Sequence, residues 1–200
     1  RAACARLCSR RHLAASTTPS LVRARRWPPR QRRSSRRMRR KAVPAFLTVN
    51  FRGNHTIHAD PAIRLPHSWV RGRTQGETVN NRATEKGRGV AANRWAVEAI
   101  LKRGYALATL YYGDIDPDFD DGFQNGIHAL FPLLDSEKRK WSDWGSIAGW
   151  SWGLSRCLDY LEQDPRIDGK RVAVMGHSRL GKTSLWVGAI DERFAMVMSN

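Results

Sequence analysis

A serine lies within a short segment whose residue types and spacing are typical of nucleophilic ester chemistry. Residues 171–183 read RVAVMGHSRLGKT, in which an apolar strand leads through Gly176 and a sharp turn at Ser178 into a helix. In such a nucleophile elbow the serine hydroxyl is exposed at the start of the helix, where the N–H of the next residue stabilises the oxyanion. The usual pattern is G-x-S-x-G, and this chain departs from it, because Leu180 replaces the second glycine and Gly181 follows one residue later.

The same segment also satisfies the phosphate-binding pattern G-x-x-x-x-G-K-[ST], through Gly176, Gly181, Lys182 and Thr183. Phosphate-binding loops commonly follow the first strand of their domain, whereas at least two strands are expected before this one. The residues inside the loop are His, Ser, Arg and Leu, whose side chains would crowd a backbone cradle for phosphate. We therefore favour a serine nucleophile, and a P-loop nucleotide-binding protein is the alternative.

The general base that a serine nucleophile needs is not evident in this sequence. In α/β-hydrolases the order along the chain is Ser, then the acid, then His, so the four histidines between residues 55 and 128 are excluded by topology. His177 is adjacent to the serine and leaves the turn in another direction, so we expect it to be packed or hydrogen-bonded. Both ends of the sequence look cut, at Arg1 and at Asn200. We therefore expect an inactive N-terminal fragment whose catalytic acid and His lie beyond Asn200.

Other groups that could do chemistry are interpreted as structural. Five aspartates lie between residues 114 and 121, but the glycine and terminal glutamate of a calcium loop are missing, so we expect a solvated turn and no metal site. Gly53, Asn54 and His55 follow the first predicted strand and form either a second oxyanion amide or a simple turn. The Trp-rich stretch 144–153 is expected to lie in the core rather than to bind sugar.

The elements around the motif alternate between strand and helix. Apolar runs predict strands at 45–51, 105–112, 171–175 and 194–199. Helical spacing predicts helices at 91–103, closed by Gly104, at 144–162 and at 183–190. A long polar loop is predicted at 60–90 and a turn at 164–169. This alternation predicts an α/β protein with the α/β-hydrolase fold, a mostly parallel sheet with helices on both faces and its C-terminal part missing.

The formal net charge of +17 is concentrated in one segment. Residues 1–41 hold 14 Arg, one Lys and no acidic residue, which leaves 35 − 15 = 20 basic and 18 acidic residues in the remainder. We therefore divide the chain into a basic, disordered or non-native segment at 1–42 and a partial α/β-hydrolase domain at 43–200. The basic segment is interpreted as a polyanion-binding tract, an organelle transit peptide or upstream sequence read through. We expect no nucleic acid partner for the folded domain.

Cysteine usage and hydropathy exclude further classes. Cys4, Cys8 and Cys157 form neither a disulfide framework nor a metal motif. No stretch approaches the roughly 20 apolar residues that a membrane-spanning helix needs.

The motif and several longer stretches resemble one known family. GHSRLGKT, with Arg directly after the serine and Lys four residues on, resembles the signature of the glucuronoyl esterases, carbohydrate esterase family 15. The resemblance to the bacterial branch of that family covers Pro44 to Asn200. Its clearest stretches are residues 51–56, 94–119, 121–131, 144–162 and 171–200.

The resemblance implies a serine carboxylic ester hydrolase that cleaves esters of (4-O-methyl-)glucuronic acid between xylan and lignin alcohols through an acyl-enzyme. Ser178 matches the nucleophile of the family, Arg179 the Arg that helps hold the oxyanion, and Lys182 the Lys that contacts sugar hydroxyls. It also implies no metal or organic cofactor, a small-molecule or polysaccharide ester as substrate, no membrane partner and a monomer. A secreted or periplasmic location is implied, although no signal peptide is visible in the chain. An acetylxylan or other carbohydrate esterase of the same fold is a further alternative.

Overall fold

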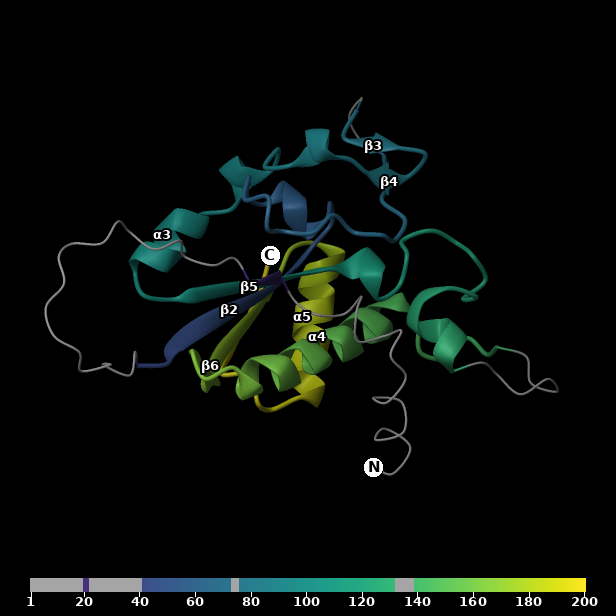
Figure 1. The fold of residues 1–200 in the computed structure, drawn as a ribbon. Helices are drawn as coiled ribbons and strands as arrows, with labels where there is room; N and C mark the ends of the chain where they lie inside the picture. The colour runs from purple at the N-terminus through teal and green to yellow at the C-terminus, as the bar shows by residue number, and fades with distance from the viewer. Residues whose placement is uncertain (1–19, 22–40, 73–75, 132–138) are drawn as a thin grey trace, which may run out of the picture.

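The computed structural model describes residues 20–21, 41–72, 76–131 and 139–200, and its centre is a sheet with the strand order β1-β5-β2-β6-β7 (Figure 1). Four strands are parallel: β2 (Val43–Asn50), β5 (Ala106–Tyr111), β6 (Ile167–Gly176) and β7 (Met196–Ser199). The short β1 (Ser20–Leu21) pairs antiparallel with β5. The prediction of a mostly parallel sheet is therefore confirmed.

Alternating residues of the strands face two different layers of helices. Ala45, Leu47 and Val49 of β2 belong to a large core cluster shared with α4 (Ser146–Gln163) and α5 (Arg179–Ile190). Leu107 of β5 belongs instead to a smaller cluster, against which Phe46 packs, under α3 (Val97–Lys102). This period of two is what a sheet covered on both faces requires. Figure 1 shows α4 and α5 on one side of the sheet and α3 on the other.

The prediction that the Trp-rich stretch 144–153 lies in the core is right for Trp150 of α4 and wrong for Trp144, which is 39% exposed. Trp150 is 3% exposed, and Leu154, Leu158 and Leu161 follow it at helical spacing with no exposed area. The Trp150 indole donates to the Asp116 carbonyl oxygen over 2.9 Å, so the polar end of the ring is also satisfied. Each of these side chains contributes roughly 1.5–3 kcal/mol by leaving water.

The predicted helix at 91–103 is wrong in its first half. Residues Ala92–Arg94 form a 3₁₀ turn, Trp95 is extended (φ −125°, ψ 111°), and the α-helix begins only at Val97. The Val97 N–H bonds to the Trp95 carbonyl over 2.8 Å, which closes a tight turn and breaks the helical ladder. The predicted end is right: Gly104 has φ +83°, and the N–H groups of Gly104 and Tyr105 bond back to the last turn of α3.

Two predicted irregular segments contain regular structure. The stretch 60–90 is not one long loop, because β3 (Thr78–Val79) and β4 (Arg82–Ala83) form a hairpin and Glu85–Gly87 a 3₁₀ turn. Asn80 and Asn81 between the strands have φ of +50° and +57°, as a two-residue type I′ turn needs. The turn predicted at 164–169 is also wrong in part, because β6 already begins at Ile167 and pairs with Val43 there.

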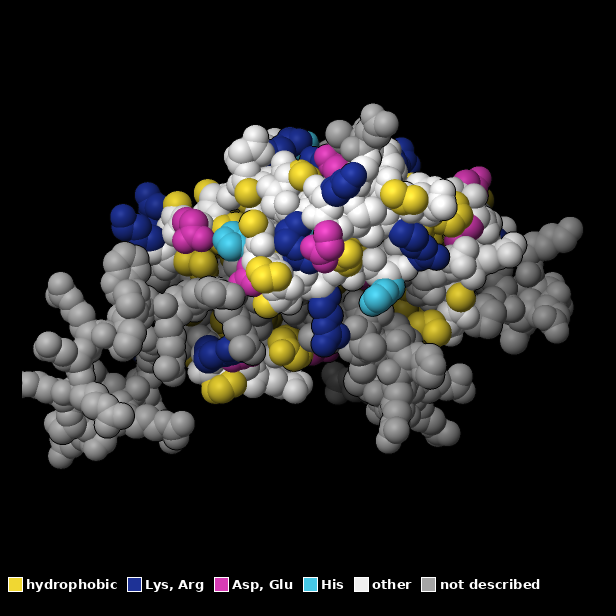
Figure 2. All heavy atoms as spheres, turned by 45° about the horizontal axis from the view of Figure 1, so that its top comes forward, with side chains coloured by type: hydrophobic (Ala, Val, Ile, Leu, Met, Phe, Trp, Pro, Cys, Tyr) yellow, Lys and Arg dark blue, Asp and Glu magenta, His cyan; other side chains and the backbone are white. Residues whose placement is uncertain are grey.

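The prediction of a disordered or non-native segment at 1–42 falls almost entirely outside the described residues, as do Cys4 and Cys8. On the face drawn in Figure 2, Lys and Arg side chains alternate with Asp and Glu, consistent with the nearly balanced charge of residues 42–200. None of the helices in the described ranges combines the length and apolar character needed to cross a membrane.

Candidate active site

Ser178 occupies the apex of the turn between β6 and α5 in a strained backbone conformation. Its φ of 57° and ψ of −126° place it where non-glycine residues are rare, and such a conformation costs roughly 1–3 kcal/mol. The residue is exposed, and it is the N-cap of α5. Its own N–H is held by the Asn200 carbonyl oxygen over 2.5 Å. In the first turn of α5, the N–H groups of Leu180 and Lys182 bond to the carbonyl oxygens of His177 and Ser178, each over 3.0 Å. The Arg179 N–H makes no such backbone bond within the described residues, and in a nucleophile elbow the amide directly after the serine is the one that faces the oxyanion.

The glycine pattern of the elbow now has a steric explanation. A Cβ on Gly176 would lie 2.0 Å from the Leu180 carbonyl oxygen, so the helix could not start where it does. Leu180, at the position of the usual second glycine, has no exposed area and fills the core instead. At Gly181 the helix approaches the end of β7 closely, because a Cβ there would lie 2.7 Å from Ser199 Oγ and 3.0 Å from the Asn200 oxygen. The shifted glycine therefore serves contact between α5 and the end of β7.

The geometry does not favour the phosphate-binding alternative. In a phosphate-binding loop the hydroxyl of the final Ser/Thr faces a magnesium ion. Here Thr183 has no exposed area, and its hydroxyl donates to the Arg179 carbonyl over 3.0 Å within the helix.

Arg179 and Lys182 lie in the first turn of α5 at positions i and i+3, on neighbouring parts of its surface. Arg179 Nη1 donates to both carboxylate oxygens of Asp118, over 2.7 and 2.8 Å. Its guanidinium carbon lies 5.4 Å from the centroid of the Phe51 ring, a cation–π distance. Lys182 is exposed, and no hydrogen bond or ion pair to its ammonium occurs within the described ranges.

The acidic turn after β5 is not the solvated turn that the sequence predicted. Asp116 is 3% exposed, and burial raises its pKa to about 6. Burial likewise raises the pKa of Asp114 to about 6, although the Ser68 hydroxyl donates to it over 2.6 Å. Asp118 is bound by arginines, and only Asp120 is exposed as expected. In the described part of the chain, no group of three or more His, Cys, Asp or Glu side chains could hold a metal ion.

Of the histidines, His177 differs from the sequence prediction. His177 is exposed, not packed or hydrogen-bonded as predicted, because the turn directs it away from the core. His55 is 1% exposed, and burial, with a smaller contribution from Arg88, lowers its pKa to about 4. His128 is buried and stacked on Trp144 with ring centroids 4.2 Å apart. Neither His55 nor His128 makes a hydrogen bond to Ser178 among the described residues.

The turn after β2 is organised by Asn50. Its Oδ1 accepts from the N–H groups of Gly53, over 2.8 Å, and Arg52, over 3.2 Å, so neither amide is free for an oxyanion. Asn54 and His55 continue into a buried 3₁₀ turn. Of the two sequence interpretations, the simple turn is therefore the better supported for Gly53.

A parallel sheet with helices on both faces and a strained, exposed serine between a strand and a helix define the α/β-hydrolase fold. The family model for glucuronyl esterases of fungi matches residues 85–200. The chain belongs to the glucuronoyl esterase family.

Similar proteins include bacterial esterases of known structure. The chain is 54% identical over 158 residues to the carbohydrate esterase MZ0003 of an unknown prokaryote, a match that covers 79% of this chain and 36% of that protein. A promiscuous esterase of carbohydrate esterase family 15 from a marine bacterial metagenome is 53% identical, with a TM-score of 0.70, and the match covers 80% of this chain and 40% of that one. A glucuronoyl esterase from Solibacter usitatus is 44% identical, with a TM-score of 0.68 and coverages of 78% and 39%. The chain thus spans well under half the length of these relatives, and none of the comparisons supports nucleotide binding.

Sequence reasoning missed three residues beside the motif: Asp118, which binds Arg179, Arg71, which forms an ion pair with Asp118, and Tyr112, whose hydroxyl donates to Asp118. A usable signal existed for Asp118, because it follows β5, and the carboxyl ends of neighbouring parallel strands meet at one edge of a sheet. Arg71 lies in the stretch predicted as a featureless loop, where no local pattern marks it.

Proposed function

We propose that this chain supplies the nucleophile of a serine carboxylic ester hydrolase that cleaves esters of (4-O-methyl-)glucuronic acid between xylan and lignin alcohols. The conformation of Ser178 carries the proposal, because a strained, exposed serine at the N-terminus of a helix has no evident structural use. Membership of the glucuronoyl esterase family supports the choice of ester.

In this reaction the Ser178 hydroxyl attacks the ester carbonyl while a histidine removes its proton, and an acyl-enzyme forms as the alcohol leaves. The Arg179 guanidinium and the main-chain N–H of Arg179 stabilise the oxyanion, and losing one such donor typically costs about 3–4 kcal/mol of barrier. Lys182 donates to hydroxyls of the glucuronate ring. We propose that the catalytic acid and His come from sequence beyond these 200 residues, since no His follows Ser178 here.

The natural substrate is proposed to be a small-molecule or polysaccharide ester of glucuronoxylan. The enzyme is proposed to be a secreted or periplasmic monomer that uses no metal or organic cofactor. One relative at 53% identity is described as promiscuous, so a panel of esters is the appropriate assay.

The test is Ser178→Ala in the full-length protein that carries this chain, assayed on methyl and benzyl esters of glucuronate and on an acetyl ester. The variant should lose at least roughly a thousandfold in kcat, with an unchanged melting temperature. Ser142→Ala, at another exposed serine, is the matched control and should retain full activity. Hydrolysis by Ser178→Ala within tenfold of the unaltered enzyme would refute the nucleophile assignment. Hydrolysis of acetyl but not glucuronate esters would favour the acetylxylan esterase alternative.

A further inference from the structure

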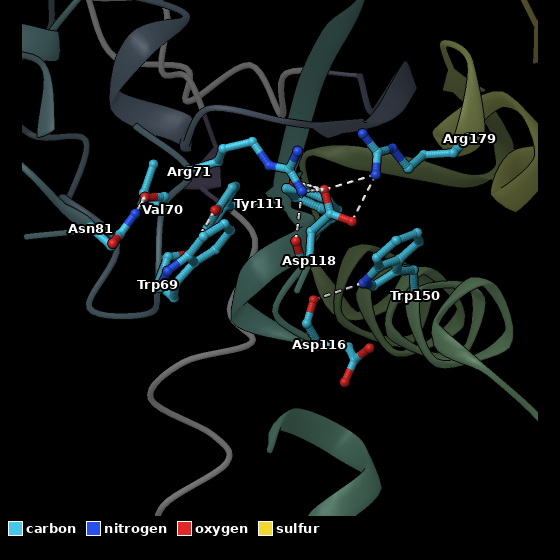
Figure 3. Close-up of polar contacts among 10 residues, drawn as sticks. Trp69, Val70, Arg71, Asn81, Tyr111, Asp116, Asp118, Trp150 and Arg179 are labelled. Atoms are coloured by element: carbon cyan, nitrogen blue, oxygen red, sulfur yellow. Dashed lines mark hydrogen bonds and ion pairs between the residues drawn. The ribbon is translucent and has the colours of Figure 1, made fainter. Parts of the chain in front are cut away.

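Asp118 lies between two guanidinium groups at the carboxyl edge of the sheet (Figure 3). Both of its carboxylate oxygens accept from Arg179 Nη1, over 2.7 and 2.8 Å. Arg71 Nη2 lies 3.3 Å from Oδ2 and donates to the Asp118 main-chain oxygen over 2.9 Å. The Tyr112 hydroxyl donates to Oδ2 over 2.8 Å. The Asp118 side chain is only 13% exposed, so these contacts are shielded from water more than a surface ion pair is.

Asp118 binds only one of the three nitrogens of the Arg179 guanidinium. Nη1 is bound to Asp118, while Nε and Nη2 have no hydrogen-bond partner within the described ranges. A guanidinium carries five N–H donors in a fixed plane, so fixing one nitrogen also fixes the direction of the others. Phe51 packs against the same group at 5.4 Å, which restricts it from a second side. The Arg179 guanidinium is therefore held in one orientation, and its N–H groups on Nε and Nη2 remain available to bind another group.

Asp118 is itself held by the segment before the β3–β4 hairpin. Arg71 belongs to that segment, whose neighbouring residues also bind the region after β5. The Tyr111 hydroxyl donates to the Trp69 carbonyl over 2.8 Å, and the Trp69 and Phe119 rings lie 5.1 Å apart. Burial raises the pKa of Tyr112, so its hydroxyl stays a donor across the working range of pH.

We propose that Asp118 is a positioning residue for ester hydrolysis, which holds Arg179 by one nitrogen so that its other N–H groups face the oxyanion. The inference rests on the proposed oxyanion role of Arg179. Two arginines and one carboxylate leave the cluster a formal charge of +1, so it still attracts an oxyanion. Without the carboxylate the two guanidinium groups repel each other, and Arg179, whose side chain is 39% exposed, turns into solvent.

The experiment is a double-mutant cycle in the full-length protein with Asp118→Asn and Arg179→Ala, assayed on a benzyl ester of glucuronate. Asp118→Asn keeps the shape of the side chain and removes its charge. We expect it to lower kcat by at least roughly tenfold, because a misplaced catalytic group loses much of its effect, with KM changed less than threefold. In the Arg179→Ala background the same substitution should change kcat less than threefold, because Asp118 acts through Arg179. Asp120→Asn is the matched control, since Asp120 is exposed and, among the residues that the structure describes, its side chain bonds only to the Gly122 N–H.

A second measurement keeps the inference separate from the proposed function. NMR of the Arg179 guanidinium should show slow rotation with resolved Nη signals in the unaltered protein and averaged signals in Asp118→Asn. A loss of kcat below tenfold, an undiminished loss in the Arg179→Ala background, or unchanged Arg179 signals would each overturn the role of Asp118. If the unaltered enzyme hydrolyses no ester, the proposed function fails, and the NMR result still decides whether Asp118 positions Arg179.

Discussion

Replacing Gly176 by alanine tests the steric basis of the elbow most directly. The new Cβ would lie 2.0 Å from the Leu180 carbonyl oxygen, 2.5 Å from its carbonyl carbon and 2.7 Å from Ser184 Oγ. Carbon–oxygen contacts normally stay beyond about 3.3 Å, so the first turn of α5 must move by roughly 1.3 Å. Two of the three clashing atoms belong to the backbone, and no rotamer change can relieve them. Overpacking of this kind costs about 3 kcal/mol of folding free energy.

The displacement should reduce activity as well as stability, because Ser178 and Arg179 move with the start of α5. A misplacement of about 1 Å can lower a rate by roughly 100-fold. Urea unfolding and kcat/KM on a glucuronate ester measure the two effects in the full-length protein. Gly145→Ala is the control, since a Cβ there meets nothing within 4 Å. If Gly176→Ala unfolds within about 1 kcal/mol of the unaltered protein and keeps its activity, the steric reasoning is wrong.

Three further predictions address the site and its surroundings. Lys182→Ala should weaken hydrolysis of glucuronate esters at least roughly tenfold more than that of acetyl esters, because only the former present sugar hydroxyls to the ammonium; equal losses would make the lysine structural. The pKa of His55 is about 4 in the folded protein and 6.5 in the unfolded chain. The buried neutral imidazole therefore contributes to the free energy of unfolding above pH 6.5. This contribution, about 3 kcal/mol at most, is lost as the pH falls towards 4. His55→Gln should therefore show a smaller loss of stability than the unaltered protein between pH 6.5 and 4 in urea unfolding, and parallel curves would contradict the burial of His55. Burial raises the pKa of Cys157 to about 12, so peptide-resolved mass spectrometry should find Cys157 unmodified by iodoacetamide at pH 8 under native conditions and modified in urea.

The central elements could be predicted because their signals are local. The apolar runs at 45–51 and 105–112 became β2 and β5 with ends shifted by one or two residues. The strand–turn–helix around Ser178 was recognised from one short segment, since the glycines and the serine that shape the elbow are neighbours in sequence. The hairpin in the predicted loop also had a local signal, the adjacent Asn80 and Asn81, which suit a type I′ turn.

The surroundings of the serine could not be read in the same way. Asp118 is 61 residues from Arg179 and 47 from Arg71, so neither ion pair leaves a periodic trace in the sequence. An aspartate beside a proline and other aspartates is typical of a solvated turn, and only the tertiary fold brings the arginines to it. The spacing of Trp95 and Val97 fits a helix, but the extended backbone at Trp95 delays its start.

The contact between the elbow and β7 limits how the turn at Ser178 can be moved to another protein. The Ser178 N–H bonds to the Asn200 oxygen, the Asn200 N–H bonds to the Gly176 oxygen over 3.2 Å, and Gly181 leaves room for Ser199. The smallest portable unit is therefore the whole βαβ crossover from Ile167 to Asn200. A designer who grafts only the loop and the first turn of α5 onto a new scaffold would leave behind the strand that holds the serine in its strained conformation.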